Sequence, residues 1–218
     1  MHHLLIICLI FSLAAAADSL FYTEIQGILG YAAMDDKVVY RSGHAADAMQ
    51  LNSLGFDYLQ KFSGQAGDTG TAALQARLAY SADREKAELQ LYNAYFKNQA
   101  SGLWIGHNRI AFGLASYWDT HGDLLQPLPM YGFGFDRDWG LGLSKDTLDG
   151  GLQFSLTSGT GLNLRTEGNW LTAIRLARGV LNYDNYSVGL ALLSGQVPDS
   201  RGYTILDRRL KTLSLIGV

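Results

Sequence analysis

Regular alternation of large apolar residues is the feature that most constrains this chain. In "WGLGLSKDTLDGGLQFSLTSG", residues 139–159, two short runs place Trp, Leu or Phe at every second position, with Gly, Ser, Gln or Thr between them. A period of two is that of a β-strand, whose successive side chains point to opposite faces. The second face is small and almost uncharged. It suits the wet lumen of a membrane barrel at least as well as the exterior of a soluble sheet.

The same alternation recurs along the chain between turn signals such as "GQAGDTG", residues 64–70. The 25 Gly, 12 Tyr and only 3 Pro favour strands and turns. The stretches 34–51 and 115–135 indicate loops, the first with one or two helical turns at 44–51. With the final segment 208–218 we count nine or ten strands, the others being residues 21–31, 54–62, 71–82, 86–96, 103–114, 139–144, 152–157, 168–178 and 185–195.

The N-terminus predicts export. Residues 1–17, "MHHLLIICLIFSLAAAA", join an apolar run to a small-residue cleavage site, so we interpret them as a signal peptide. A buried N-terminal segment of a cytosolic protein is the alternative. The sole cysteine, Cys8, would leave with the signal peptide, which excludes disulfides from the exported chain. No later apolar run is long enough for a transmembrane helix, so contact with a membrane would require strands.

These observations predict an all-β fold. We expect one domain, residues 18–218, forming an antiparallel up-and-down transmembrane β-barrel. Aromatic residues near strand ends suit an interfacial girdle: Tyr31, Tyr80, Tyr95, Trp139, Trp170 and Tyr186. In particular, we place Tyr95 on the apolar face with Leu89 and Leu91. The polar positions of the opposite face are predicted to line a pore: Glu24, Gln26, Asp57, Gln75, Arg77, Glu88, Gln90, His107, Arg109 and Arg175. A secreted β-sandwich is the alternative fold.

One strand carries a resemblance to a known family. "GHNRIAFGL", residues 106–114, resembles a strand of Gram-negative outer-membrane porins of the phosphate-selective type, with Ala111 where those porins often have proline. The resemblance implies a barrel of sixteen or eighteen strands that ends on an aromatic residue, whereas this chain stops at Val218. We therefore interpret it as the N-terminal portion of a longer barrel. The rival interpretation is a complete small barrel of eight to ten strands.

Catalytic and metal-binding patterns are weak. Asp119, His121 and Asp123 alternate in "DTHGD" and are candidate metal ligands, but an ordinary polar loop explains them equally well. No Gly-x-Ser-x-Gly elbow is present, and the carboxylates are dispersed. We predict no enzyme activity, no cofactor and no metal. A net charge of −3 offers no electrostatic case for a nucleic-acid partner.

Three function classes stay open. The first is an outer-membrane channel for passive diffusion of small hydrophilic or anionic solutes, including ions. The second is a scaffold barrel that sheathes a partner such as an electron-transfer cytochrome, with room left by Gly140, Gly142, Ala173 and Gly189. The third is a soluble secreted binding protein. For the channel we expect outer-membrane lipid and small solutes as partners, with a homotrimer as the expected oligomer.

Overall fold

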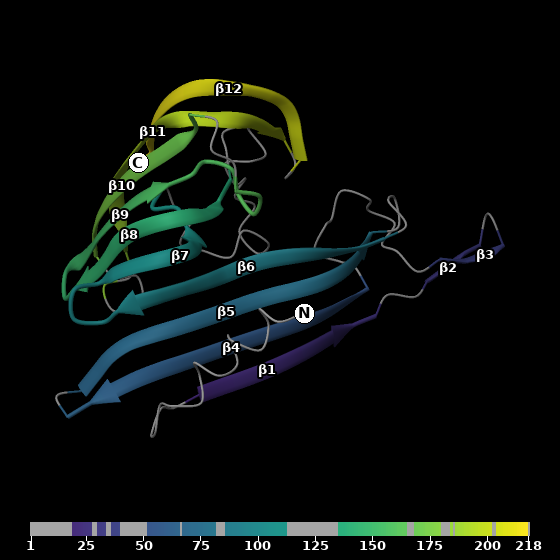
Figure 1. The fold of residues 1–218 in the computed structure, drawn as a ribbon, viewed down its shortest axis with the longest axis horizontal. Coiled ribbons are helices and arrows are strands. Elements are labelled where there is room, and N and C mark those ends of the chain that lie inside the picture. Colours follow the sequence, from purple (N-terminus) through teal and green to yellow (C-terminus); the bar gives the residue numbers. More distant parts are fainter. Residues whose placement is uncertain are drawn as a thin grey trace.

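Ten antiparallel strands form one continuous sheet in the computed structural model (Figure 1). Each strand of this sheet pairs with the sheet's next strand along the chain, in the order β1-β4-β5-β6-β7-β8-β9-β10-β11-β12, which is an up-and-down meander. The structure describes residues 19–27, 30–33, 36–39, 52–65, 67–81, 86–112, 135–164, 168–179, 184, 186–201 and 204–217. The strands are β1 (Ser19–Gln26), β4 (Ser53–Gly64), β5 (Gly67–Ser81), β6 (Lys86–Asn98), β7 (Leu103–Arg109), β8 (Arg137–Thr147), β9 (Gly150–Thr157), β10 (Trp170–Arg178), β11 (Val188–Arg201) and β12 (Thr204–Gly217).

The all-β prediction is confirmed, and the ten strands of the sheet agree with the nine or ten predicted, but several boundaries were wrong, among them the following three. The predicted strand 21–31 divides, because β1 ends at Gln26 and Gly30 opens a separate hairpin, β2 (Gly30–Ala32) with β3 (Lys37–Val39). Most of the predicted turn 64–70 belongs to β4 and β5. The predicted strand 103–114 leaves the sheet after Arg109.

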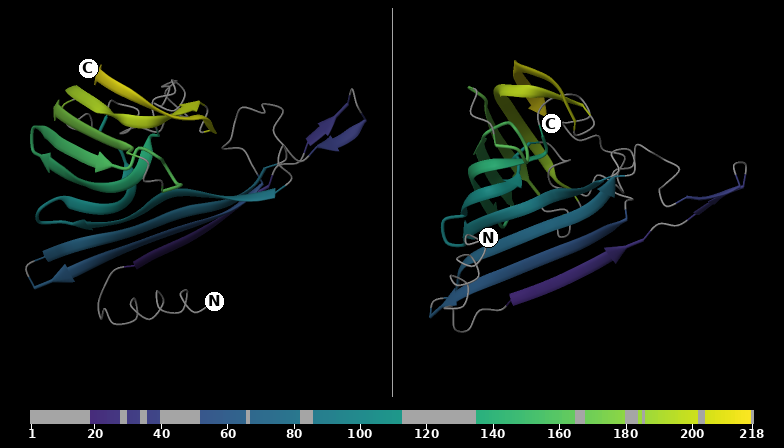
Figure 2. Two further views of the ribbon diagram at one scale, coloured as in Figure 1. Left: turned by 45° about the horizontal axis from the view of Figure 1, so that its top comes forward. Right: turned by 45° about the vertical axis from the view of Figure 1, so that its right-hand side comes forward.

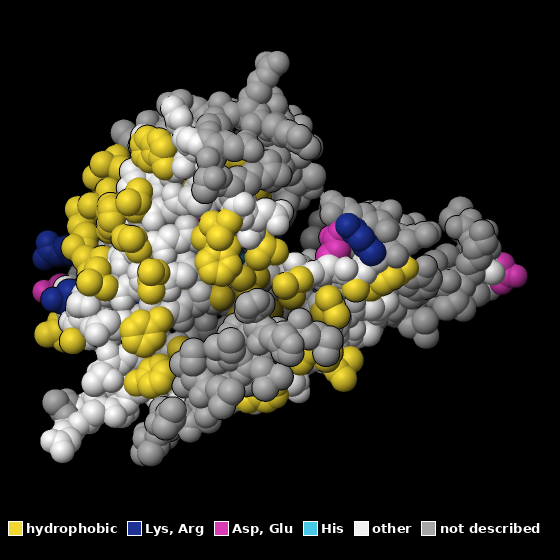
Figure 3. Space-filling view, viewed as in Figure 1, with side chains coloured by type: hydrophobic (Ala, Val, Ile, Leu, Met, Phe, Trp, Pro, Cys, Tyr) yellow, Lys and Arg dark blue, Asp and Glu magenta, His cyan; other side chains and the backbone are white. Residues whose placement is uncertain are grey.

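The outer face of the sheet is apolar and exposed. Leu89 is 57% exposed, Ile105 62% and Val188 63%. The register places large apolar residues in neighbouring positions across the strands, as in the row Leu143, Phe154, Ile174 and Leu192. Figure 3 shows apolar side chains gathered over the curved half of the sheet. A sheet in water would bury such a face.

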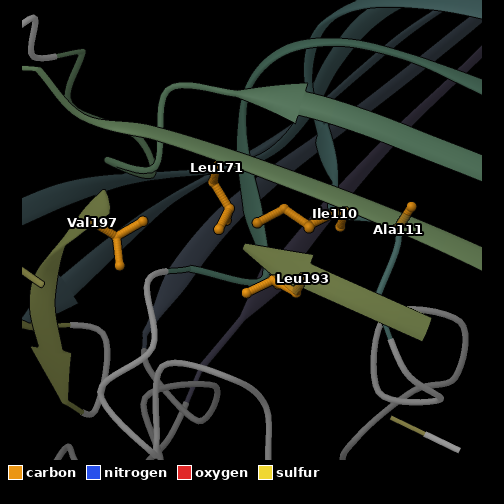
Figure 4. Packing of buried hydrophobic residues seen from close by; sticks show 6 residues of the cluster. Ile110, Ala111, Leu171, Leu193 and Val197 are labelled. Carbon is orange, nitrogen blue, oxygen red and sulfur yellow. The ribbon is translucent and has the colours of Figure 1, made fainter. Parts of the chain in front are cut away.

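The strands β7 to β12 curl, whereas β1 to β6 form a flatter wall (Figure 2). After β7 the chain turns onto the inner face of the curl. There the Ile110 amide donates to the Asp136 carbonyl at 3.0 Å, and the Ala111 amide donates to Ser155 Oγ at 3.2 Å. These contacts build a buried cluster between β7 and the strands β10 and β11 (Figure 4), which comprises Ile110, Ala111, Leu171, Ala173, Leu193 and Val197, with Phe112 packed against it.

An irregularity in the pairing of β5 with β6 corrects one predicted face. Gln75 pairs with Asn93 but Ala76 pairs with Leu91, so Tyr92 is an extra residue in β6. A β-bulge of this kind reverses the alternation beyond it. Tyr95 therefore pairs with Ala73, on the same face as Gln75, and does not share the outer face with Leu91 as predicted.

Connections differ in length at the two ends of the sheet. One end carries the connections 65–66, 99–102, 148–149 and 179–187. The opposite end carries 27–52, 82–85, 110–136, 158–169 and 202–203, so the three longest connections share that end. The strands β1 and β12 each have one partner within the described part of the chain, so they form the two margins of the sheet.

Three predictions lie outside the described residues. They are the signal peptide at 1–17, the helical turns at 44–51, and the metal candidates Asp119, His121 and Asp123. No helix within the described ranges has the length and apolar character needed to cross a membrane.

Candidate functional site on the inner face

The inner face of β1 to β6 gathers polar side chains because the antiparallel register aligns their alternate positions. Glu24 lies opposite Gly55, Gly55 opposite Arg77, and Arg77 opposite Gln90, so one row crosses four strands. The next row joins Asp57, Gln75 and Asn93. Five of the ten predicted pore-lining residues are thus brought to one surface, and Gln26 joins them through a contact with Arg77.

An ion pair organises the first row. Arg77 Nη2 donates to Glu24 Oε2 at 2.9 Å, and Nη1 donates to Gln26 Oε1 at 3.3 Å. Gly55 lies between them in the row, and a Cβ atom there would make an ordinary contact with Arg77 Nε at 3.5 Å. A shallow cavity of about 50 Å³ adjoins this pair and is lined also by Asp57, Gln75 and Tyr92. The lining of this cavity thus sets one cation, Arg77, against the two carboxylates of Glu24 and Asp57.

Hydrogen bonds continue across the wall. Asn93 Nδ2 donates to Gln75 Oε1 at 2.8 Å, and Tyr92 Oη donates to Gln90 Oε1 at 3.0 Å. The Arg137 guanidinium lies 5.1 Å from the centre of the Tyr92 ring, within the range of a cation–π contact. The bulge therefore has a consequence for the site, because its extra residue links the wall to β8.

A second, larger cavity lies further along the inner face, between β6 and β9. It has a volume of about 200 Å³ and is lined by Tyr95, Lys97, Trp104, Asn108, Arg109, Ile110, Ala111, Leu143, Ser144, Gln153 and Phe154. The register pairs Lys97 with Trp104, and Trp104 with Gly142. A Cβ atom at residue 142 would lie 2.6 Å from the Trp104 indole, so glycine there lets the ring lie against the sheet.

The remaining predicted residues occupy different surroundings. Arg109 lines the larger cavity. Arg175 is on the inner face opposite Gln153 and Ala191, but it is only 5% exposed. Glu88 accepts a salt bridge from Lys86 at 3.3 Å near the end of β6.

His107 stands apart from this polar cluster, because the register places it in the row of Leu74 and Ala94 and not in an inner row as predicted. The register pairs it with Ala94 and Trp139, and its ring packs edge-on against the Trp139 ring at 5.2 Å. Its Nδ1 lies 3.2 Å from the Tyr92 carbonyl oxygen, and the side chain is buried.

Sequence reasoning missed Tyr92, Lys97, Trp104, Arg137 and Asp138 as contributors to this face and its supports. Extending the predicted faces finds neither Lys97 nor Trp104. The bulge lies between Lys97 and the predicted polar positions Glu88 and Gln90, and Trp104 alternates out of phase with the predicted His107 and Arg109. Tyr92 carries no alternation signal because it is the bulge residue.

Asp138 supports the end of the wall. Its carboxylate is fully buried and accepts hydrogen bonds from Ser158 Oγ at 2.7 Å, from the Gly161 amide at 3.0 Å and from the Thr160 amide at 3.3 Å, with the Gly159 amide also donating. It thereby holds the connection between β9 and β10 against the start of β8.

The inner face supplies charge, hydrogen bonding and aromatic contact. Among the described residues no group of three His, Cys, Asp or Glu side chains is arranged to hold a metal ion. Comparison with known protein families, with curated proteins and with solved structures found no match.

Proposed function

We propose that this chain forms the wall of an outer-membrane channel through which small hydrophilic solutes diffuse passively. One observation carries the proposal. The continuous ten-stranded sheet exposes its large apolar residues on the outer face and gathers its charged and amide side chains on the inner face. This is the arrangement of a barrel wall between lipid and a wet lumen.

Details of the strand ends support the membrane orientation. Tyr80, Trp139 and Trp170 all lie at the end of the sheet that carries the long connections. Aromatic side chains at the edge of an apolar band match the girdle at a membrane interface. The three longest connections, 27–52, 110–136 and 158–169, also share this end, and outer-membrane barrels carry their longer loops at one end.

Alternative functions are less well supported. The described strands, apart from the hairpin of β2 and β3, form one sheet, whereas a soluble sandwich packs two sheets face to face. A scaffold for a partner protein needs space over the small inner residues. Trp104 lies over Gly142, and Ala173 belongs to the buried cluster. The protein's own side chains thus occupy two of the four positions that favoured the scaffold.

Conductance and lipid dependence test the proposal. The full chain is refolded in detergent, inserted into a planar bilayer and examined for discrete conductance steps. We expect steps that scale with salt concentration. A chain that folds without detergent or lipid, or one that inserts without conducting, contradicts the channel.

Spin labels test which face meets lipid. Labels at positions 88, 89, 90 and 91 in vesicles should alternate, with oxygen reaching 89 and 91 and a water-soluble quencher reaching 88 and 90. Beyond the bulge the pattern shifts, so a label at 95 should respond to the water-soluble reagent. If both reagents fail to reach 89 and 91, the lipid-facing assignment is wrong.

A further inference from the structure

The inner wall formed by β4 to β6 carries opposite charges at two levels along its strands. At one level Asp57 lies opposite Gln75, and at the other Lys61 and Lys97 lie on either side of Thr71. Asp57 and Lys61 both lie on β4, an even number of residues apart with no bulge between them, so they point to the same face. At about 3.3 Å per residue, the two levels are roughly 13 Å apart.

These charges are available to a ligand. The side chains of Asp57, Lys61 and Lys97 form no hydrogen bond or ion pair with another residue in the described ranges. The neighbouring Glu24, by contrast, is paired with Arg77 at 2.9 Å. Asp57 lines the smaller cavity and Lys97 lines the larger one, so both border open space. A surface of this kind favours a solute that carries a complementary charge at each end.

An apolar row separates the two levels. Leu59 pairs with Ala73, and Ala73 pairs with Tyr95, midway between Asp57 and Lys61 on the same face. An extended tripeptide matches this sequence of surfaces, because its ammonium and carboxylate groups are roughly 10 Å apart, with a side chain between them. The long, flexible lysine side chains can cover the remaining distance to the carboxylate.

We propose that this wall binds short peptides of about three residues as zwitterions, extended along the strands. The ammonium group would lie at Asp57, the carboxylate between Lys61 and Lys97, and the central side chain against Tyr95. The inference rests on the proposed channel for its biological meaning, because it names the solute class that the inner wall retains. The binding itself requires only the folded chain.

Equilibrium binding to the full chain in detergent tests the proposal independently of conductance. The probes for isothermal titration calorimetry are the tripeptide Ala-Leu-Ala, its N-acetyl form, its C-terminal amide, and free leucine. We expect saturable binding of the tripeptide. Each other probe should bind at least about tenfold more weakly, because it lacks one charge or cannot span the two levels. Equal binding of any of them, or no saturable binding of the tripeptide, overturns the proposal.

Variants assign each end of the peptide to its partner. Asp57→Asn should weaken binding of the tripeptide about tenfold but leave binding of the N-acetyl peptide nearly unchanged, because that peptide has no ammonium group. Lys97→Gln should weaken binding of the tripeptide by a similar factor and leave the C-terminal amide nearly unchanged. Equal losses for the free and the capped peptides would mean that the substitutions act on the structure of the wall, which overturns the assignment.

Two matched controls lie away from this surface. Lys86→Gln removes a lysine at the other end of β6, where it pairs with Glu88 at 3.3 Å, and Asp146→Asn removes a carboxylate on β8. Both variants should bind the tripeptide as the wild type does, and a tenfold loss in either overturns the site. Binding without conductance would refute the channel alone, and conductance without binding would refute this site alone.

Discussion

The inner face of the sheet has two halves that differ in polarity and burial. Both halves arise from the same alternation of side chains along the strands. On β4 to β6 the inward positions stay polar and accessible enough to form cavities around Arg77. On β10 and β11 the inward positions are Leu171, Ala173 and Leu193, which are buried beneath the chain at 110–112. A strand period therefore assigns a residue to a face, but the surroundings of that face depend on what folds over it.

The packed half should be the more sensitive to a new charge. Leu171 is completely buried, so Leu171→Asp loses apolar packing and buries an unpaired carboxylate, at a cost on the order of 5 kcal/mol in unfolding free energy. Urea unfolding of the protein in lipid vesicles measures this cost.

Thr71→Asp is the matched change in the open half. Thr71 lies between Lys61 and Lys97 on the inner face, so its aspartate should alter stability by less than about 1 kcal/mol. Equal destabilisation by the two substitutions would abolish the distinction between the halves.

The two faces of β6 offer a second comparison. Leu89→Arg places a cation on the exposed outer face and should cost about 2–4 kcal/mol in lipid if it lies near the midplane. Gln90→Arg, one residue along on the inner face, should fold nearly as the wild type does. Unfolding in vesicles compares the two. A Gln90→Arg variant as unstable as Leu89→Arg would contradict the wet inner face.

Asp138, near the start of β8, holds the connection between β9 and β10 through hydrogen bonds to residues 158–161. Asp138→Ala removes the acceptor from several buried donors and should lower the unfolding free energy by about 3 kcal/mol. Ser158→Ala, which removes only one of these donors, should cost about 1 kcal/mol. Thermal or urea unfolding distinguishes them, and equal costs would mean that the backbone donors contribute little.

The smallest effect concerns selectivity. Arg109→Ala should move the reversal potential under a salt gradient toward cation preference, with a shift that shrinks as ionic strength rises. Removing Arg77 and Glu24 together, as Arg77→Gln with Glu24→Gln, leaves the net charge unchanged and should leave the reversal potential close to that of the wild type. An unchanged potential in Arg109→Ala at low salt, in a conducting channel, would remove Arg109 from the pore wall.

Much of the arrangement was predictable because strand alternation is a local property. The number of strands, the apolar face with Leu74 and Leu89, and the polar face with Glu24, Gln75 and Arg77 all follow from a period of two. The ion pair between Glu24 and Arg77 joins strands that are not neighbours in the sheet, so the alternation alone indicates the shared face but not the contact.

The sequence by itself determined which residues share a face, since consecutive side chains of an extended backbone must point in opposite directions. Only the tertiary structure decided where that rule is interrupted and which inner surface is covered. The bulge at Tyr92 moved Tyr95 to the polar face, and the turn after Arg109 brought Ile110 against Leu171. Both depend on pairing and packing between segments distant in the chain, so no local pattern records them.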